Sequence, residues 1–488
     1  MSNSRTPSAT PSATPSAASP VGREPVERRI DVSAGLRTGP LGDLSDFPQW
    51  FAEHARRAYT RVRRVPLDGL EGWVTDPDTG DLRHHTGQFF TVHGLRVSNP
   101  GAPVPEWSQP IIDQPEIGIL GILAAPIDGV LHLLMQAKVE PGNANGLQLS
   151  PTVQATRSNY TQVHRGRAVP YLSHFLDIHS RPGVLADVRQ SEQGSWFNRK
   201  RNRNVVIELP EPVEAIDGFR WLTLGQVHEL LGREDTVNMD ARTVLSCLPF
   251  TGPAGPADGD GFRSALRRSG DPSARSLHST AEILGWLTER RTGSDLTTRR
   301  IPLAKVAGWN RTPERMSHDE DAFFNVIGVR VEAAGREVGG WSQPMIEPVG
   351  RGVIAFLVRR IDGVLHVLAH ARTEPGFTDV VELGPTVQCV TDSYAHLPPG
   401  TLPPFLDEVL GASAERIRFD NALSEEGGRF HHALNRYLIV EASDDVPSDH
   451  PAYRWLTLHQ LSGLLKHSHY VNIQARSLIA CLHSLYSG

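Results

Sequence analysis

The stretch from Val130 to Tyr160 reads VLHLLMQAKVEPGNANGLQLSPTVQATRSNY, and it returns from Val364 to Tyr394 as VLHVLAHARTEPGFTDVVELGPTVQCVTDSY. Each copy opens with alternating apolar and polar residues, which is typical of a β-strand with one face in a core. In the first copy, one face of the predicted strand carries Leu131, Leu133, Met135 and Ala137, and the other carries His132, Gln136 and Lys138. The repeat predicts two related domains, each with a strand that carries polar groups on one face.

The similarity extends well beyond this stretch. Between Trp107 and Tyr160, 24 of 54 positions are identical to those 234 residues later, where composition alone gives about three or four. We therefore predict a tandem duplication of an α+β unit built around a mixed sheet. Apolar periodicity predicts helices over residues 46–59 and 280–291 and near the end of each copy, over 225–232 and 459–466.

Composition suggests where the copies begin and end. The chain has 488 residues, enough for two or more domains, and its first residues include PSATPSATPSAA, which can bury almost nothing. This predicts a disordered leader over residues 1–40. A Gly/Pro-rich stretch predicts a linker over 251–278, and the two repeats then occupy 41–250 and 279–488.

Several classes of protein are disfavoured by charge and composition. The formal net charge of −6 argues against a general nucleic-acid surface or a polybasic membrane patch. No apolar run has transmembrane length. The three cysteines form neither a CxxC pair nor a zinc spacing, which predicts inert thiols in a reducing cytoplasm.

The segments WSQPII, QAKVEPGN, LSPTVQATRSNYT and ELGPTVQ resemble the NDP-hexose 2,3-dehydratases of deoxysugar biosynthesis, over nearly everything after the leader. This resemblance implies a Nudix-like fold in each half, a homodimer and a bacterial antibiotic pathway. It also implies a dTDP-4-keto-6-deoxyglucose substrate and a dTDP-3,4-diketo-2,6-dideoxyhexose product, which a downstream NADPH-dependent ketoreductase would consume.

The implied reaction needs three kinds of group. The C4 carbonyl acidifies the C3 proton, so a positioned base can remove it. The enolate can then expel the C2 hydroxyl if an acid protonates the leaving oxygen, and donors near the C4 oxygen would stabilise the negative charge. Neither a metal nor a nicotinamide is required.

Motifs for competing chemistries are absent from the sequence. It contains no R-E-x-x-E-E string, which a Nudix pyrophosphatase needs to hold divalent metal. No G-x-G-x-x-G opens a helix after a strand, and Tyr160 is not followed by the lysine of a Tyr-x-x-x-Lys motif. We predict no metal and no cofactor. A diverged Nudix-type nucleotide-sugar hydrolase and a noncatalytic nucleotide-sugar-binding protein remain the alternatives.

The candidate catalytic residues follow the repeated strand and are Lys138, Glu140, Ser158, Asn159 and Tyr160. Lys138 could act as a base if burial lowers its pKa, or as a partner of the enolate or diphosphate if it stays charged. Tyr160 could donate to the leaving hydroxyl. Glu140 could equally brace the Glu-Pro-Gly turn, and His132 is better explained as a structural histidine.

Nucleotide binding requires a flat apolar surface for thymine and cations for the diphosphate. The candidates are Phe89, Trp107, Gln109, Thr156, Arg165 and Arg203. Arg203 closes the basic run Phe197–Arg203, of which we expect one or two cations to contact ligand.

The second copy supplies a second pocket, for which the candidates are Trp341, Arg372, Glu374, Thr386, Tyr394 and Arg436. Lys138 becomes Arg372 there, and a guanidinium cannot deprotonate to act as a base. Thr156 becomes Val390, so a small polar group is lost as well. We therefore predict that the N-terminal copy carries out the chemistry and that the other pocket binds without processing.

Overall fold

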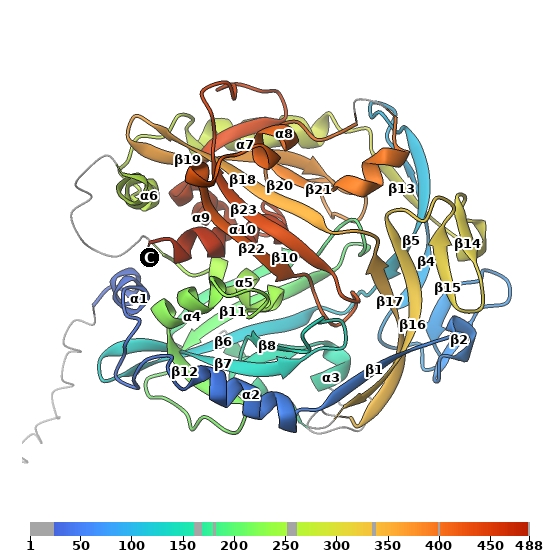
Figure 1. Cartoon of the computed structure of the whole chain (residues 1–488), viewed down its shortest axis with the longest axis horizontal. Helices are drawn as coiled ribbons and strands as arrows, with labels where there is room; N and C mark the ends of the chain where they lie inside the picture. Colours follow the sequence, from blue (N-terminus) through green and yellow to red (C-terminus); the bar gives the residue numbers. More distant parts are fainter. Residues whose placement is uncertain are drawn as a thin grey trace, which may run out of the picture.

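The computed structural model describes residues 24–160, 168–178, 182–250, 261–333, 338–398 and 401–486. Within these residues the strands form four sheets, two of seven strands and two of five. Figure 1 shows the large sheet of the N-terminal copy below that of the C-terminal copy, with the small sheets to the right. The architecture is mixed α+β, as the sequence predicts.

The two large sheets have the same topology. The first runs β10 (Val184–Ser191), β11 (Arg201–Glu208), β6 (Gly118–Ile127), β7 (Val130–Val139) and β12 (Phe219–Thr223), with β8 (Leu147–Ser150) on β7 and β9 (Val153–Ala155) on β6. The second runs β22 (Ile417–Ser424), β23 (Leu434–Glu441), β18 (Gly352–Ile361) and β19 (Val364–Thr373), with β20 (Val381–Gly384) and β24 (Tyr453–Thr457) on β19 and β21 (Val387–Val390) on β18. Both are mixed sheets, because β6 pairs with β11 and β18 with β23 in parallel while the other pairings are antiparallel.

The turn that precedes each repeated strand explains the shared register. Asp128 and Gly129 have φ values of 46° and 80°, and Asp362 and Gly363 have values of 49° and 77°. Two consecutive left-handed residues match the twist of a tight hairpin, and Asp-Gly is favoured there. Leu131, on the face predicted to be apolar, is accordingly buried in the core.

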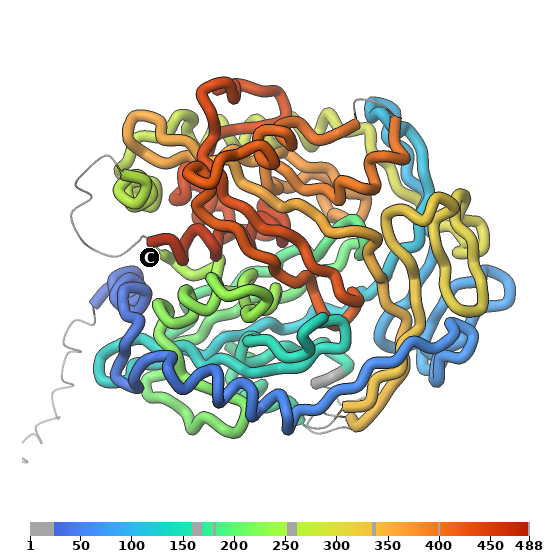
Figure 2. The backbone as a smooth tube through the Cα atoms, viewed as in Figure 1, coloured from blue at the N-terminus to red at the C-terminus, as the bar shows by residue number. Residues whose placement is uncertain are grey.

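The small sheets exchange strands between the copies. One contains β1 (Thr60–Val65) of the first copy with β14 (Trp309–Arg311), β15 (Arg315–His318), β16 (Phe324–Ala333) and β17 (Gly340–Pro348) of the second. The other contains β13 (Thr297–Ile301) of the second copy with β2 (Trp73–Thr75), β3 (Leu82–His84), β4 (Thr91–Ser98) and β5 (Glu106–Asp113) of the first. Figure 2 shows the chain of β1 crossing to the opposite copy. Each copy therefore completes a sheet of the other.

The predicted helices are present as α2 (Phe47–Arg57), α4 (Leu224–Leu231), α7 (Thr280–Thr292) and α9 (Leu458–Leu465). Thr223 and Thr457 form capping boxes that start α4 and α9. Each copy continues beyond this point into a further helix, α5 (Met239–Ser246) or α10 (Ile473–Ser484). Two short helices, α3 (Arg157–Tyr160) and α8 (Leu406–Leu410), lie in connections.

Helices α5 and α10 join the two copies through buried arginines. The Arg242 Nε donates to Ser477 Oγ at 3.2 Å, and the Arg476 Nε donates to Thr243 Oγ1 at 2.5 Å. Both guanidinium groups are fully buried, so their hydrogen bonds to the opposite copy offset a large desolvation cost. One hydrophobic cluster includes residues of both large sheets and these helices, and the copies share a core.

The predicted boundaries between leader, linker and repeats differ from the structure. Helix α1 (Val26–Ala34) lies inside the predicted leader, and α6 (Phe262–Gly270) lies inside the predicted linker. The hydroxyl of Ser33 on α1 accepts from the Leu224 N–H at 2.8 Å, and that of Ser269 on α6 accepts from Leu458 at 2.7 Å. Each copy thus begins with a helix that packs on its own core. Composition did not predict these short helices, because Gly and Pro residues flank them. Residues 1–23 and 251–260 lie outside the described residues.

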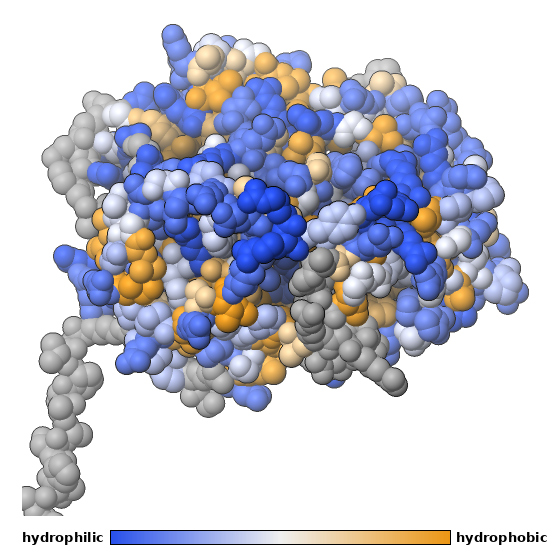
Figure 3. Space-filling model, turned by 60° about the horizontal axis from the view of Figure 1, so that its bottom comes forward, coloured by the Kyte–Doolittle hydropathy of each residue, from blue (hydrophilic) through white to orange (hydrophobic). Residues whose placement is uncertain are grey.

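Hydrophilic residues cover most of the face shown in Figure 3, and apolar residues form separate patches. Large exposed apolar side chains are scattered among distant positions, such as Tyr59, Ile216 and Leu402. Of the helices in the described ranges, none has the length and apolar character needed to cross a membrane.

Candidate active site

Two cavities lie between the large and small sheets, and residues of both copies line each of them. The first cavity, of about 470 Å³, contacts β7 and β9 of the N-terminal copy and β17 of the C-terminal copy. The second cavity, of about 560 Å³, contacts β19 and β21 of the C-terminal copy and β5 of the N-terminal copy. Each cavity therefore combines the large sheet of one copy with a wall from the other.

A chain of hydrogen bonds orders the floor of the first cavity. The Lys138 Nζ donates to the Gln154 carbonyl at 3.1 Å, and the Gln154 amide donates to Glu140 Oε1 at 2.6 Å. Asn238 donates to the Gln154 side-chain oxygen at 3.3 Å. Lys138 and Glu140 are 9% and 6% exposed, so they face the cavity from a largely dry environment.

A second group of polar residues comes from β11 and the segment before it. The Asn202 side chain accepts from the Gly118 N–H at 3.1 Å and donates to Glu192 Oε1 at 2.7 Å. Lys200 donates to the Glu116 carbonyl. Burial lowers the pKa of Lys200 to about 8, although Glu192 favours its charged form. This lysine can therefore exist as a neutral amine near physiological pH.

The C-terminal copy contributes residues 426–430, which we call the 426–430 loop. The Glu426 carboxylate accepts from the backbone N–H groups of Gly428 and Arg429 at 2.9 and 2.8 Å. The Arg429 guanidinium lies 4.4 Å from the centre of the Phe90 ring. The loop thus brings a carboxyl group and a cation to the face of the first cavity.

Gly142 of the Glu-Pro-Gly turn holds this loop in place. Its N–H donates to the Gly427 carbonyl at 2.7 Å, and its own carbonyl accepts from the His432 N–H at 2.7 Å. A Cβ at Gly142 would lie 1.8 Å from the Phe430 carbonyl oxygen. Glycine is required here because any side chain would displace the loop.

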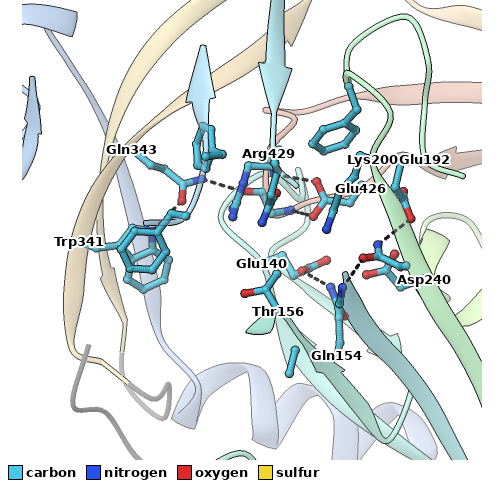
Figure 4. A pocket seen from close by; sticks show the side chains of 18 of the residues that line it. Glu140, Gln154, Thr156, Glu192, Lys200, Asp240, Trp341, Gln343, Glu426 and Arg429 are labelled. Carbon is cyan, nitrogen blue, oxygen red and sulfur yellow. Dashed lines mark hydrogen bonds between the residues drawn. The ribbon is translucent and has the colours of Figure 1, made fainter. Parts of the chain in front are cut away.

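Four carboxyl groups gather in the first cavity, on Glu140, Glu192, Asp240 and Glu426 (Figure 4). Burial and the charge of Glu140 together raise the pKa of Glu426 to about 7, although Arg429 opposes the shift. Burial and the neighbouring carboxylates raise the pKa of Asp240 well above its usual range. Within the described ranges, no group of three or more His, Cys, Asp or Glu residues could hold a metal ion.

The opposite end of the first cavity is aromatic. Trp341 donates from its indole to Gln343 at 3.0 Å, and the Gln343 amide donates to the Gly428 carbonyl at 2.6 Å. Figure 4 shows Arg429 between this aromatic end and the carboxyl groups. A flat apolar surface, a cation and an acid–base cluster therefore follow one another along the cavity.

The second cavity repeats the framework of the first. Arg372 donates to the Gln388 carbonyl at 3.1 Å, Gln388 donates to Glu374 at 3.0 Å, and Asn472 donates to Gln388 at 2.9 Å. Gly376 docks the 193–197 loop of the N-terminal copy, and a Cβ there would lie 1.9 Å from the Phe197 carbonyl. The backbone plan is the same in both cavities.

The ionisable groups differ between the cavities. Lys200, Asp240, Glu426 and Arg429 correspond to Ala433, Gln474, Gln193 and Trp196. In addition, Arg372 is tied to Glu374 through a 2.7 Å hydrogen bond from its Nε. The second cavity therefore lacks counterparts of these four ionisable groups, while it keeps Glu374, Glu425 and a paired arginine.

The structure separates some of the predicted partners. Trp107 and Gln109 line the second cavity, and Trp341 lines the first, because β5 and β17 each face the large sheet of the other copy. The grouping of Trp107 with Lys138 in one pocket is therefore wrong. Phe89 and Thr156 line the first cavity.

Other predicted residues have structural partners or lie at a distance. Ser158 donates to Glu116 at 2.9 Å, and Thr386 is buried in hydrogen bonds to β18 and β19. Arg203 and Arg436 form bidentate pairs with Asp187 and Asp420, at 2.6 to 2.8 Å, and neither lines a cavity.

Three predicted residues lie wholly or partly outside the described part of the chain. Arg165 lies outside the described residues, and so do the side chains of Asn159 and Tyr160. In the second cavity, Glu374 and Tyr394 line the wall beside Arg372. His132 is buried and hydrogen-bonded to the Val130 carbonyl, which confirms its structural role.

The sequence prediction missed Gln154, Glu192, Asp240, Glu426 and Arg429, and it did not single out Lys200 within the basic run. A signal for some of them was present. The segments S-E-Q-G-S-W-F at 191–197 and S-E-E-G-G-R-F at 424–430 share four residues at matching positions. Aligning them would have shown that the two copies differ where each loop enters a cavity.

Comparison with known proteins gives a consistent result. A family model described as NDP-hexose 2,3-dehydratase matches residues 44–248 and 280–482. Three similar proteins carry the name dTDP-4-dehydro-6-deoxy-alpha-D-glucopyranose 2,3-dehydratase. That of Saccharopolyspora spinosa is 50% identical over 96% of this chain and 97% of its own length. Those of Amycolatopsis orientalis and Streptomyces violaceoruber are 46% and 48% identical, over 93% and 91% of this chain and 93% and 98% of their own lengths.

Proposed function

Because the chain belongs to the NDP-hexose 2,3-dehydratase family, we propose that it removes water across C2 and C3 of dTDP-4-keto-6-deoxyglucose in the first cavity. The product is a dTDP-3,4-diketo-2,6-dideoxyhexose. One observation carries the choice of cavity: two pockets share a framework, but Lys200, Asp240, Glu426 and Arg429 occur in the first alone.

The substrate fits the order of groups along this cavity. Thymine would stack at the aromatic end near Trp341, and the diphosphate would lie against Arg429. The sugar would then reach the carboxyl groups and lysines at the large sheet. Such a pose places the reacting carbons where the ionisable groups are buried.

Lys200 takes the C3 proton in this proposal. A base works best when its pKa lies near the operating pH, and burial lowers the pKa of Lys200 to about 8. Lys138 donates to the enolate oxygen that develops at C4 and stabilises it. Glu140 accepts from the Gln154 side chain, and the backbone carbonyl of Gln154 accepts from Lys138, so this carboxylate helps to orient the floor of the cavity.

The family resemblance supports further proposals about the setting. Each half is Nudix-like, the chain forms a homodimer, and an NADPH-dependent ketoreductase consumes the reactive diketone. The enzyme works in the cytoplasm, a proposal that rests on its thiols. Cys247, Cys389 and Cys481 are all free, and burial raises the pKa of Cys389 to about 11.

Incubation with dTDP-4-keto-6-deoxyglucose and a trapping ketoreductase tests the function directly. We expect mass spectrometry to show a product that has lost one water, with the same rate after exhaustive chelation. Release of a sugar phosphate that depends on divalent metal would identify a hydrolase instead. Retention of unchanged substrate would identify a binding protein.

A further inference from the structure

Asp240 is a buried carboxyl group of the first cavity that lies at the start of a helix. One of its oxygens has no hydrogen bond to any described residue. It is the second residue of α5, after Asn238, whose side chain accepts from the Ala241 N–H at 2.8 Å. Asp240 is 4% exposed and lines the cavity, and its Oδ1 has no hydrogen-bond partner among the described residues. A buried polar atom that faces a cavity in this way is available to a ligand.

The other copy shows that the fold does not require this carboxyl group. Gln474 occupies the matching position on α10, after the capping Asn472, and its amide donates to Glu425 at 3.2 Å. In the second cavity, an amide side chain therefore fills this helix position without a carboxyl group. The carboxyl group of Asp240 belongs to the first cavity alone.

The surroundings favour the protonated form of Asp240. Burial raises its pKa most, and the charges of Glu140, Glu192 and Glu426 raise it further, while Lys138 opposes them. The N-terminus of a short helix favours the carboxylate, but this effect is weaker than burial among three like charges. A bound diphosphate would add negative charge to a cavity that already holds four carboxyl groups and three cations.

We propose that Asp240 is the acid that donates a proton to the C2 hydroxyl as it leaves. This inference rests on the proposed function, and it assigns the partner of the base Lys200. Asp240 is also well placed for it, because Figure 4 shows its carboxyl group near Glu192 at the charged end of the cavity, which Lys138 and Lys200 also line.

The step is balanced in atoms and electrons. The Lys200 amine takes the C3 proton, and the C–H electrons form the enolate. The enolate then restores the C4 carbonyl, the C2–C3 double bond forms, and the C2–O bond breaks as oxygen takes the Asp240 proton and departs as water. Ketonisation of the enol product adds one proton at C2 and releases one from the C3 hydroxyl. Lys200 and Asp240 therefore return to their starting protonation states without an outside reactant.

Asp240→Asn separates proton removal from water loss. With substrate deuterated at C3, we expect dehydration to fall at least about 100-fold, as for the loss of a general acid. Wash-out of the deuterium from recovered substrate should stay within about threefold of wild type, because the base and the enolate donor remain. Loss of the wash-out together with dehydration would make Asp240 the base and overturn the inference.

A substrate with fluorine in place of the C2 hydroxyl provides the decisive control. Fluoride leaves without protonation, so Asp240→Asn should eliminate it within about tenfold of the wild-type rate. An equal loss of fluoride and water elimination would contradict an acid role. Gln474→Met, at the matching position of the other copy, should change neither rate by more than about twofold.

Wild-type enzyme gives a test that does not depend on a folded variant. Water elimination should decline at high pH, where the acid loses its proton, whereas fluoride elimination should not decline there. Identical high-pH limbs would overturn the inference. If the wild-type enzyme eliminates no water from the natural substrate, the proposed function is wrong. If it does, and Asp240→Asn eliminates water at the same rate, only the role of Asp240 is wrong.

Discussion

The first and second cavities contain the same framework and different chemistry. In both, a strand residue donates to the backbone carbonyl of a glutamine whose amide binds a glutamate, and a glycine holds a loop of the other copy. Four ionisable groups of the first cavity, Lys200, Asp240, Glu426 and Arg429, are replaced in the other copy by the neutral residues Ala433, Gln474, Gln193 and Trp196. The difference teaches that the repeated motif builds a pocket, while the variable loop and helix residues set which ionisable groups line it.

Replacement of the base should produce the largest difference between the cavities. Lys200→Arg keeps a positive charge but cannot accept a proton, so we expect kcat to fall about 1,000-fold. Steady-state kinetics measure this fall in kcat, on a variant whose melting temperature is unchanged. Ala433→Lys puts the same amine at the matching position of the other copy and should leave kcat within about twofold; a rise in turnover would show that the C-terminal copy is also reactive.

Loss of the enolate donor should have a somewhat smaller effect. Lys138→Met should lower kcat about 100-fold, within the range for removing one stabilising donor, with KM changed by less than about threefold. The deuterium wash-out at C3 should fall in parallel, because the enolate itself is destabilised. Arg372→Met should cost at most about threefold in kcat, and the opposite ranking would place the chemistry in the C-terminal large sheet.

The pH dependence should reflect the base of the first cavity. Lys200 must be neutral to act, so kcat/KM should increase as the pH rises toward its pKa of about 8. An amine with that pKa is neutral about 50 times more often at pH 8 than at pH 6. A profile that falls between pH 6 and pH 8 would contradict a lysine base, and Arg372→Met should leave the profile unchanged.

Arg429 should contribute mainly to binding. Arg429→Met removes the cation proposed for the diphosphate, so we expect KM to rise about tenfold and kcat to change by less than about threefold. Titration with dTDP should show the same loss of affinity. Trp196→Phe alters the corresponding loop position in the second cavity and should leave KM within about twofold; an effect equal to that of Arg429→Met would mean that the two cavities are not independent.

The smallest effects should come from matched positions in the scaffold, where the copies agree. Ser33→Ala and Ser269→Ala each remove a hydroxyl that accepts a buried backbone N–H, at a cost of about 1 kcal/mol. We expect both to lower the melting temperature by similar amounts, about 1–3 °C, with kcat unchanged. A much larger shift for one of them would show that one helix supports its copy more strongly.

Periodicity and internal repetition were sufficient to predict the duplication, the strand that carries Lys138 and the main helices. They could not predict that the walls of the cavities are exchanged, because pairing between β1 and β16 depends on contacts far apart in the sequence. The same exchange placed Trp107 opposite Arg372 instead of Lys138. Glu426 and Asp240 were missed because their significance comes from burial beside other carboxyl groups, which the sequence does not display.

The exchange of β1 and β13 bears on how the gene arose. Each copy gives its first strand to the small sheet of the other and receives one in return, so we infer that the ancestor was an intertwined pair of chains. Fusion of the two genes made that association independent of protein concentration. It also allowed one of two equivalent pockets to change, provided that its half still supplied β17 and the 426–430 loop to the other cavity. The C-terminal half is therefore an obligatory part of the first cavity, although the large sheet of that cavity lies elsewhere in the chain.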